Sequence, residues 1–194
     1  MSIREWRERV RGYAEITDFV PIARRYFIIG AFDGVLTILG GILGAAAGGA
    51  GPEQSGVVIA FGIGAGLALG VSSTVGAYEA ERIQSKLDQY SLERAMLREM
   101  GEERRNAFRF AAIVTALVHG ISPLIAGLLP VLPFVFLPFS TAVLAAVVIS
   151  LAFLFGMGVY LGSVLKERAL TTGLRFVIAG IVTALLVYLL GGRL

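Results

Sequence analysis

The first residue of this chain that could do chemistry is an aspartate inside an apolar stretch. Asp33 lies in RRYFIIGAFDGVLTILGGILG, residues 24–44, which has the composition of a membrane-spanning helix. A carboxylate at that depth costs about 2.5–3.5 kcal/mol on membrane-insertion scales. A chain that keeps such a group commonly uses it to hold a cation or a proton. The alternative is a structural aspartate that pairs with an arginine at the cytoplasmic edge.

A second set of candidate ligands lies at residues 79–109, the most highly charged part of the chain. Its members are carboxylates and thioethers: Glu79, Glu81, Met96, Glu99, Met100, Glu102 and Glu103. The last five would fall on or beside one helix face if the helix continued through Gly101. Oxygen ligands suit Mg²⁺, Mn²⁺ and Fe²⁺, and thioethers shift the preference toward Fe²⁺. The alternative is a solvated helix whose glutamates pair with neighbouring arginines.

The sequence contains one histidine, His119, and no cysteine. Imidazole titrates near neutral pH, so His119 is a candidate proton relay or metal ligand, with a hydrogen-bonded packing residue as the alternative. These counts exclude a multi-histidine zinc site, thiolate metal sites and a cysteine nucleophile. The glycines of GIGAG at 62–66 lie within an apolar helix, so they are no dinucleotide fingerprint. We expect no enzymatic activity and no cofactor, and a lipid-directed membrane enzyme is the weakest hypothesis.

The elements that position these residues are predicted to be membrane helices. The chain has 194 residues, of which 56% are hydrophobic and 16% charged, whereas about a quarter are charged in an average soluble domain. We therefore predict an all-α membrane protein of one domain, 1–194, with a short cytoplasmic helical insertion at about 81–106. Five spans are expected, at about 26–49, 56–80, 107–129, 139–163 and 170–190.

Residues 3–18 are predicted to form a basic amphipathic helix with Trp6 on its apolar side. Such a helix suits a membrane surface, or it packs on the cytoplasmic part of the protein itself. We expect Pro21 to end this helix, Gly101 to break the insertion before the third span, and Pro123 to kink that span.

Glycines recur at four-residue spacing in the first two predicted spans, for example at Gly40, Gly44 and Gly48. Small residues at this spacing let helix backbones approach closely. We expect these two helices to pack against each other or against a second copy of the chain. The hydroxyls at residues 72–74 either line a polar path or bond back to their own helix.

The distribution of positive charge predicts the orientation in the membrane. Of the 17 Lys and Arg, six precede the first span, seven lie at 82–109 and three lie at 166–175. The positive-inside rule then places the N-terminus and the insertion in the cytoplasm and the C-terminus outside, in a multi-pass protein of the cell membrane. The net charge of +3 reflects this topology, and we expect the lipid bilayer, rather than nucleic acid, as the surrounding partner.

Four stretches of the sequence resemble the vacuolar iron transporter family. They are RRYFIIGAFDGVLTILGGILGAA, GVSSTVGAYEAER, GLLPVLPF and FGMGVYLG. The resemblance covers nearly the whole chain and identifies it as a short prokaryotic-type member. It implies a five-span homodimer that moves Fe²⁺ or Mn²⁺ out of the cytoplasm in exchange for protons.

The resemblance also implies roles for the candidate residues. Asp33 matches the family's first-span acid, which is proposed to bind the transported ion between two subunits. The Glu and Met residues of the insertion would collect the metal, although the insertion here is much shorter. Plant-type members carry a methionine where this chain has Ser73, and an acid earlier in that span, near Ala65. A non-transporting membrane protein that binds or senses metal through the insertion is the alternative function.

Overall fold

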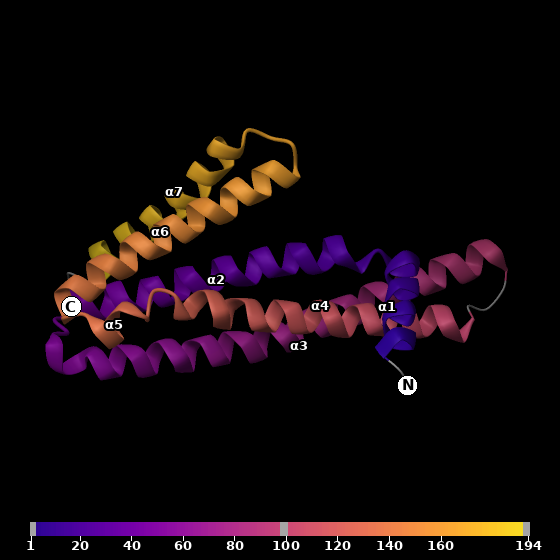
Figure 1. Ribbon diagram of the computed structural model, residues 1–194, viewed down its shortest axis with the longest axis horizontal. Helices are drawn as coiled ribbons and strands as arrows, with labels where there is room; N and C mark the ends of the chain where they lie inside the picture. The colour runs from indigo at the N-terminus through magenta and orange to yellow at the C-terminus, as the bar shows by residue number, and fades with distance from the viewer. Residues whose placement is uncertain (1–2, 98–100, 192–194) are drawn as a thin grey trace. The chain divides into compact units, whose positions relative to one another are not determined.

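A computed structural model describes residues 3–97 and 101–191. These residues form helices joined by short turns, and they contain no strand. Figure 1 shows the elements, which are α1 (Ile3–Thr17), α2 (Phe19–Ala47), the 3₁₀ turn Pro52–Gln54, α3 (Ser55–Met96), α4 (Glu102–Leu128), α5 (Pro133–Phe136), α6 (Phe139–Val164) and α7 (Ala169–Gly191). Helices α2, α3, α4, α6 and α7 are long and apolar enough to cross a membrane. The predicted all-α membrane fold with five spans is confirmed.

The break between the amphipathic helix and the first span lies at Asp18, so the prediction that Pro21 ends the helix is wrong. Asp18 has a left-handed backbone with φ 47°, and its N–H donates to the Ala14 carbonyl at 2.9 Å. Pro21 instead occupies the first turn of α2. Proline is tolerated there because the first N–H groups of a helix have no partner within it.

The charged insertion is built from the ends of two helices. Helix α3 continues from the second span without interruption for 42 residues and ends at Met96, a length of about 63 Å at 1.5 Å per residue. Leu97 is left-handed with φ 51°, and α4 begins at Glu102, directly after Gly101. The predicted break at Gly101 is confirmed, and Met96 and Glu103 therefore do not share one helix face.

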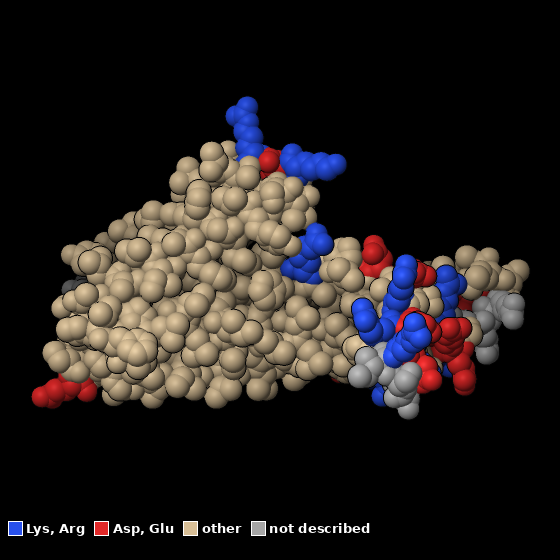
Figure 2. All heavy atoms as spheres, in the orientation of Figure 1, with Lys and Arg blue, Asp and Glu red and all other residues tan. Residues whose placement is uncertain are grey.

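The chain divides into two compact units, and each is described by itself. Unit 1 comprises residues 1–30 and 70–121. Its aromatic contacts join α1 and the start of α2 to α4, because the ring of Phe110 in α4 lies 5.4 Å from that of Tyr13 in α1 and 5.9 Å from that of Phe19 in α2. The second half of α1 therefore packs on the protein itself, while Trp6 near its start is 50% exposed. Figure 2 shows many charged side chains gathered over α1 and the neighbouring ends of α3 and α4.

Unit 2 comprises residues 31–69 and 122–194. It contains two clusters of buried hydrophobic residues. Ile38 and Ile42 of α2 are fully buried there among Val58, Val131 and Phe134. Close packing in this unit depends on glycine, because a Cβ built on Gly34 would lie 2.6 Å from the Cα of Pro123. The glycines of the first two spans thus face α4 at several points, and Gly41 of α2 faces a side chain of α3.

Helices α6 and α7 form an antiparallel pair at the end of the chain. The backbones meet where Gly158 faces Gly173, and Gly162 faces Ala169. The turn between them closes with two hydrogen bonds, from Glu167 N–H to the Gly162 carbonyl at 3.0 Å and from Lys166 N–H to the Ser163 carbonyl at 3.3 Å. This is a Schellman cap, and its left-handed position, usually glycine, is occupied by Lys166 with φ 56°.

Candidate functional site

Asp33 is the central residue of α2, with fourteen residues of the helix on each side. It is exposed, as is Thr37 one turn later, whereas Val35 and Ile38 on the opposite face are completely buried. The side chain of Asp33 therefore lies on the face of α2 that unit 2 leaves uncovered. In an apolar helix of this length, that face would otherwise meet hydrocarbon.

Three polar side chains meet in unit 1, around Tyr26 of α2. The Tyr26 side chain lies close to the Glu81 carboxylate of α3. Its backbone carbonyl lies 2.9 Å from Nδ1 of His119 in α4, and the two rings are 5.0 Å apart. The Arg25 guanidinium lies 5.4 Å from the centre of the Tyr26 ring. A carboxylate, a phenol and an imidazole from three helices thus form one cluster.

The contact between His119 and Tyr26 fixes the role of one imidazole nitrogen. A carbonyl oxygen can only accept a hydrogen bond, so Nδ1 of His119 carries the proton and donates it. In the neutral ring the acceptor is then Nε2, which is the atom able to take up a proton or bind a metal ion. His119 is half-buried. This hydrogen bond agrees with the alternative prediction that His119 is a hydrogen-bonded packing residue. It does not conflict with a proton-relay role, because that role would use the other ring nitrogen.

A close helix crossing holds the cluster in place. Gly70 of α3 and Gly120 of α4 lie against each other, because a Cβ built on Gly70 would be 2.8 Å from the Gly120 carbonyl oxygen. The Thr74 hydroxyl donates to the Gly70 carbonyl at 2.8 Å, next to this crossing. Of the two roles predicted for the hydroxyls at 72–74, Thr74 therefore adopts the bond to its own helix.

The remaining predicted ligands lie apart from this cluster. Glu79 is exposed and pairs with Arg82 at 3.1 Å, as the alternative of a solvated, charge-paired helix predicts. Glu102 and Glu103 are exposed in the first turn of α4, and Met96 is 46% exposed at the end of α3. The other two predicted ligands, Glu99 and Met100, lie outside the described residues. Within residues 3–97 and 101–191, no group of three acidic or histidine side chains is arranged to hold a metal ion.

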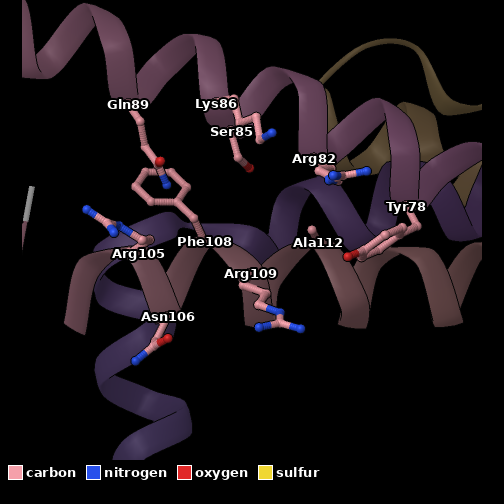
Figure 3. Close-up of a pocket in the computed structure, with 10 residues that line it drawn as sticks. All are labelled: Tyr78, Arg82, Ser85, Lys86, Gln89, Arg105, Asn106, Phe108, Arg109 and Ala112. Carbon is pink, nitrogen blue, oxygen red and sulfur yellow. The ribbon is translucent and has the colours of Figure 1, made fainter. Parts of the chain in front are cut away.

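A basic pocket of about 390 Å³ lies between α3 and α4 in unit 1 (Figure 3). Four cationic side chains contribute to its lining: Arg82, Lys86, Arg105 and Arg109. Tyr78, Phe108 and Ala112 supply apolar surface. The sequence analysis did not predict this pocket, because it used these four cations only to predict the orientation of the chain in the membrane.

Sequence reasoning also missed Tyr26. It lies 93 residues from His119, and no periodicity connects positions so far apart. The available signal was the position of an aromatic residue beside Arg25 at the start of a span, since tyrosine commonly marks a membrane interface.

Two comparisons with known proteins place this chain. The family model described as the VIT family matches residues 79–192, which is more than half of the chain. An uncharacterised protein of Methanocaldococcus jannaschii is 32% identical over 170 residues, covering 86% of this chain and 87% of the relative. The family match covers the end of α3 and all of α4, α5, α6 and α7. The chain therefore belongs to the VIT family, as a short prokaryotic-type member.

Proposed function

We propose that this protein exports a divalent metal ion, Fe²⁺ or Mn²⁺, from the cytoplasm in exchange for protons, as a homodimer in the cell membrane. Its membership of the VIT family indicates a metal transporter rather than an enzyme. The observation that carries the proposal is the position of Asp33, an exposed carboxylate at the centre of an apolar helix.

The exposure of Asp33 favours a second copy of the chain. Leaving an ionised carboxylate against lipid costs about 2.5–3.5 kcal/mol, so a stable arrangement covers it with protein or with an aqueous path. In a two-fold dimer the same surface of each copy meets. A dimer formed through the exposed face of α2 would bring two Asp33 carboxylates together, with Thr37 one turn away.

Two facing carboxylates suit an exchange mechanism. Close like charges disfavour the doubly ionised state, so the pair holds either a cation or a proton. Metal binding displaces the proton, and protonation from the outside releases the metal. Carboxylate and hydroxyl oxygens suit both Mn²⁺ and Fe²⁺, and Ser73 adds no thioether where plant-type relatives have methionine.

The cluster around Tyr26 supplies a candidate proton path in this scheme. Glu81 can accept and release a proton, and Nε2 of His119 can do the same. Both side chains belong to unit 1. Glu81 directly follows the predicted cytoplasmic end of the second span, and His119 lies about 18 Å inside the third span at 1.5 Å per residue. We therefore assign His119 and Glu81 to proton exchange with the cytoplasm rather than to metal binding.

A flux assay tests the role of Asp33. The protein is reconstituted in proteoliposomes, and uptake of Mn²⁺ or Fe²⁺ is measured with and without a pH gradient. We expect Asp33→Asn to abolish flux, because an amide neither binds the ion strongly nor exchanges a proton. Asp88→Asn is the matched control, since Asp88 lies in the insertion and accepts a hydrogen bond from Gln84 at 2.9 Å. Wild-type flux by a folded Asp33→Asn variant would remove Asp33 from the mechanism.

Cross-linking tests the dimer separately. The chain has no cysteine, so a single introduced thiol reports one contact. We expect Thr37→Cys to form a disulfide-linked dimer under mild oxidation in membranes. Leu144→Cys is the control, because Leu144 is 65% exposed and belongs to a different helix, α6. Equal cross-linking of both variants would contradict the proposed interface.

The same vesicles distinguish the alternative function. A protein that only binds or senses metal through its insertion would retain metal on the vesicle surface without accumulating it inside. Flux that follows the pH gradient would exclude this alternative.

A further inference from the structure

The pocket between α3 and α4 carries an unusual excess of positive charge. Four of its ten lining side chains are cationic and none is acidic. Figure 3 shows one wall formed by α3, with Arg82 and Lys86, and the other formed by α4, with Arg105 and Arg109. We propose that this pocket binds the phosphate of an anionic phospholipid from the cytoplasmic leaflet. The proposal does not depend on metal transport.

The charges of the pocket are only partly neutralised by the protein. Arg82 forms an ion pair with Glu79, with a nitrogen–oxygen distance of 3.1 Å. Lys86 and Arg109 form no ion pair within the part of the chain that the structure describes. One acid against the three cations Arg82, Lys86 and Arg109 leaves an excess of about two positive charges on these side chains. Guanidinium groups match phosphate oxygens with two parallel hydrogen bonds, so arginine is the preferred residue for such a ligand.

The depth of the pocket favours a lipid over a soluble phosphate. The second span is predicted to end near residue 80 and the third to begin near residue 107. At 1.5 Å per residue, Arg82 and Arg105 lie about 3 Å outside these boundaries, Arg109 about 3 Å inside and Lys86 about 9 Å outside. The headgroup region is about 5–8 Å thick on each side of the hydrocarbon. The three arginines therefore lie at the level of lipid phosphates, and the backbone of Lys86 lies at the outer edge of the headgroup region.

The apolar part of the lining fits the rest of a lipid molecule. Tyr78 and Ala112 lie on the membrane side of the cations along their helices, and Phe108 is half-buried among them. These side chains can contact the glycerol and the first methylene groups, which a free phosphate ion lacks. Basic pockets between membrane helices on the cytoplasmic side are a known type of anionic lipid site. A lipid bound here would join α3 and α4 on either side of the break between Met96 and Glu102.

Calorimetric titration of the full-length protein in a neutral detergent tests this proposal. The probe is short-chain phosphatidylglycerol, and the comparison ligands are phosphatidylcholine with the same chains and inorganic phosphate. The test variant is Lys86→Gln with Arg109→Gln. The matched control is Arg4→Gln with Arg7→Gln, which removes the same charge from the exposed side of α1.

We expect wild-type protein to bind phosphatidylglycerol in preference to both comparison ligands. The test variant should bind about 30-fold more weakly, which corresponds to about 1 kcal/mol for each cation removed. The control should change the Kd less than threefold. If the double variant does not fold, Lys86→Gln alone gives the same test with an expected loss of about fivefold.

Three results would overturn the proposal. Unchanged binding by the folded test variant would show that the pocket is not the site. An equal loss in the control would show that overall charge, rather than this pocket, attracts the lipid. Inorganic phosphate that binds as tightly as phosphatidylglycerol would identify a soluble anion as the ligand.

Discussion

Gly34, the residue after Asp33, offers the sharpest test of how the first span is held. A Cβ at this position would lie 2.6 Å from the Cα and 2.9 Å from the carbonyl carbon of Pro123 in α4. Ordinary contacts begin at 3.4 Å, so α2 and α4 would have to separate by about 0.8 Å. The obstacle is backbone, which cannot rotate away as a side chain can.

We expect Gly34→Ala to destabilise the protein by about 1–3 kcal/mol, the usual cost of forcing an extra methyl group into a packed core. Gly64→Ala is the matched control, because a Cβ on Gly64 meets nothing within 4 Å. The control should be neutral or stabilising by about 0.5–1 kcal/mol, since alanine is the better helix former.

Thermal unfolding in detergent measures the difference between the two variants. With about 2–4 °C for each kcal/mol in a chain of this size, the midpoint of Gly34→Ala should lie about 2–16 °C below that of Gly64→Ala. Equal midpoints would refute the reasoning that α2 and α4 are packed backbone to backbone. Flux through a folded Gly34→Ala variant should also fall, because the shift displaces the neighbouring Asp33.

Two further variants probe other local features. Lys166→Gly should stabilise the turn between α6 and α7 by about 0.5–1 kcal/mol, because glycine adopts the left-handed backbone at φ 56° without steric cost. His119→Ala should lower stability by about 0.5–1.5 kcal/mol, the net value of its 2.9 Å hydrogen bond to Tyr26. His119→Gln should lose less, since its amide N–H can donate to the same carbonyl.

The same thermal assay checks both variants. Lys86→Gly is the control for the first, and it should destabilise by about 1 kcal/mol because Lys86 lies inside α3. A Lys166→Gly variant that is less stable than wild type would contradict the cap. Identical losses in His119→Ala and His119→Gln would show that the hydrogen bond contributes nothing to stability.

The membrane fold was predictable because the signal for a spanning helix is local. Long apolar runs placed all five spans, and charge at 79–109 placed the insertion. Local rules failed where two signals competed. Pro21 was expected to break the helix, but proline fits a first turn, and the break fell on Asp18, whose short polar side chain tolerates a left-handed backbone.

The contacts between helices were much less predictable. The spacing of glycines indicated close packing without naming the partner, and Gly34 meets Pro123 of α4, 89 positions later. The meeting of Tyr26, Glu81 and His119 likewise depends on how three helices are arranged. The sequence alone showed that a carboxylate at Asp33 is energetically costly within a membrane span. Only the structure showed that Asp33 lies on the exposed face of α2.

The hairpin of α6 and α7 has a consequence for how the protein is made. Its two helices are joined by residues 165–168 alone, so they find each other with little loss of chain entropy. Glycine contacts such as Gly158 with Gly173 let the two backbones pack closely. As this part of the chain is synthesised, α6 and α7 can enter the bilayer as a pair in which each helix covers the polar backbone and small side chains of the other.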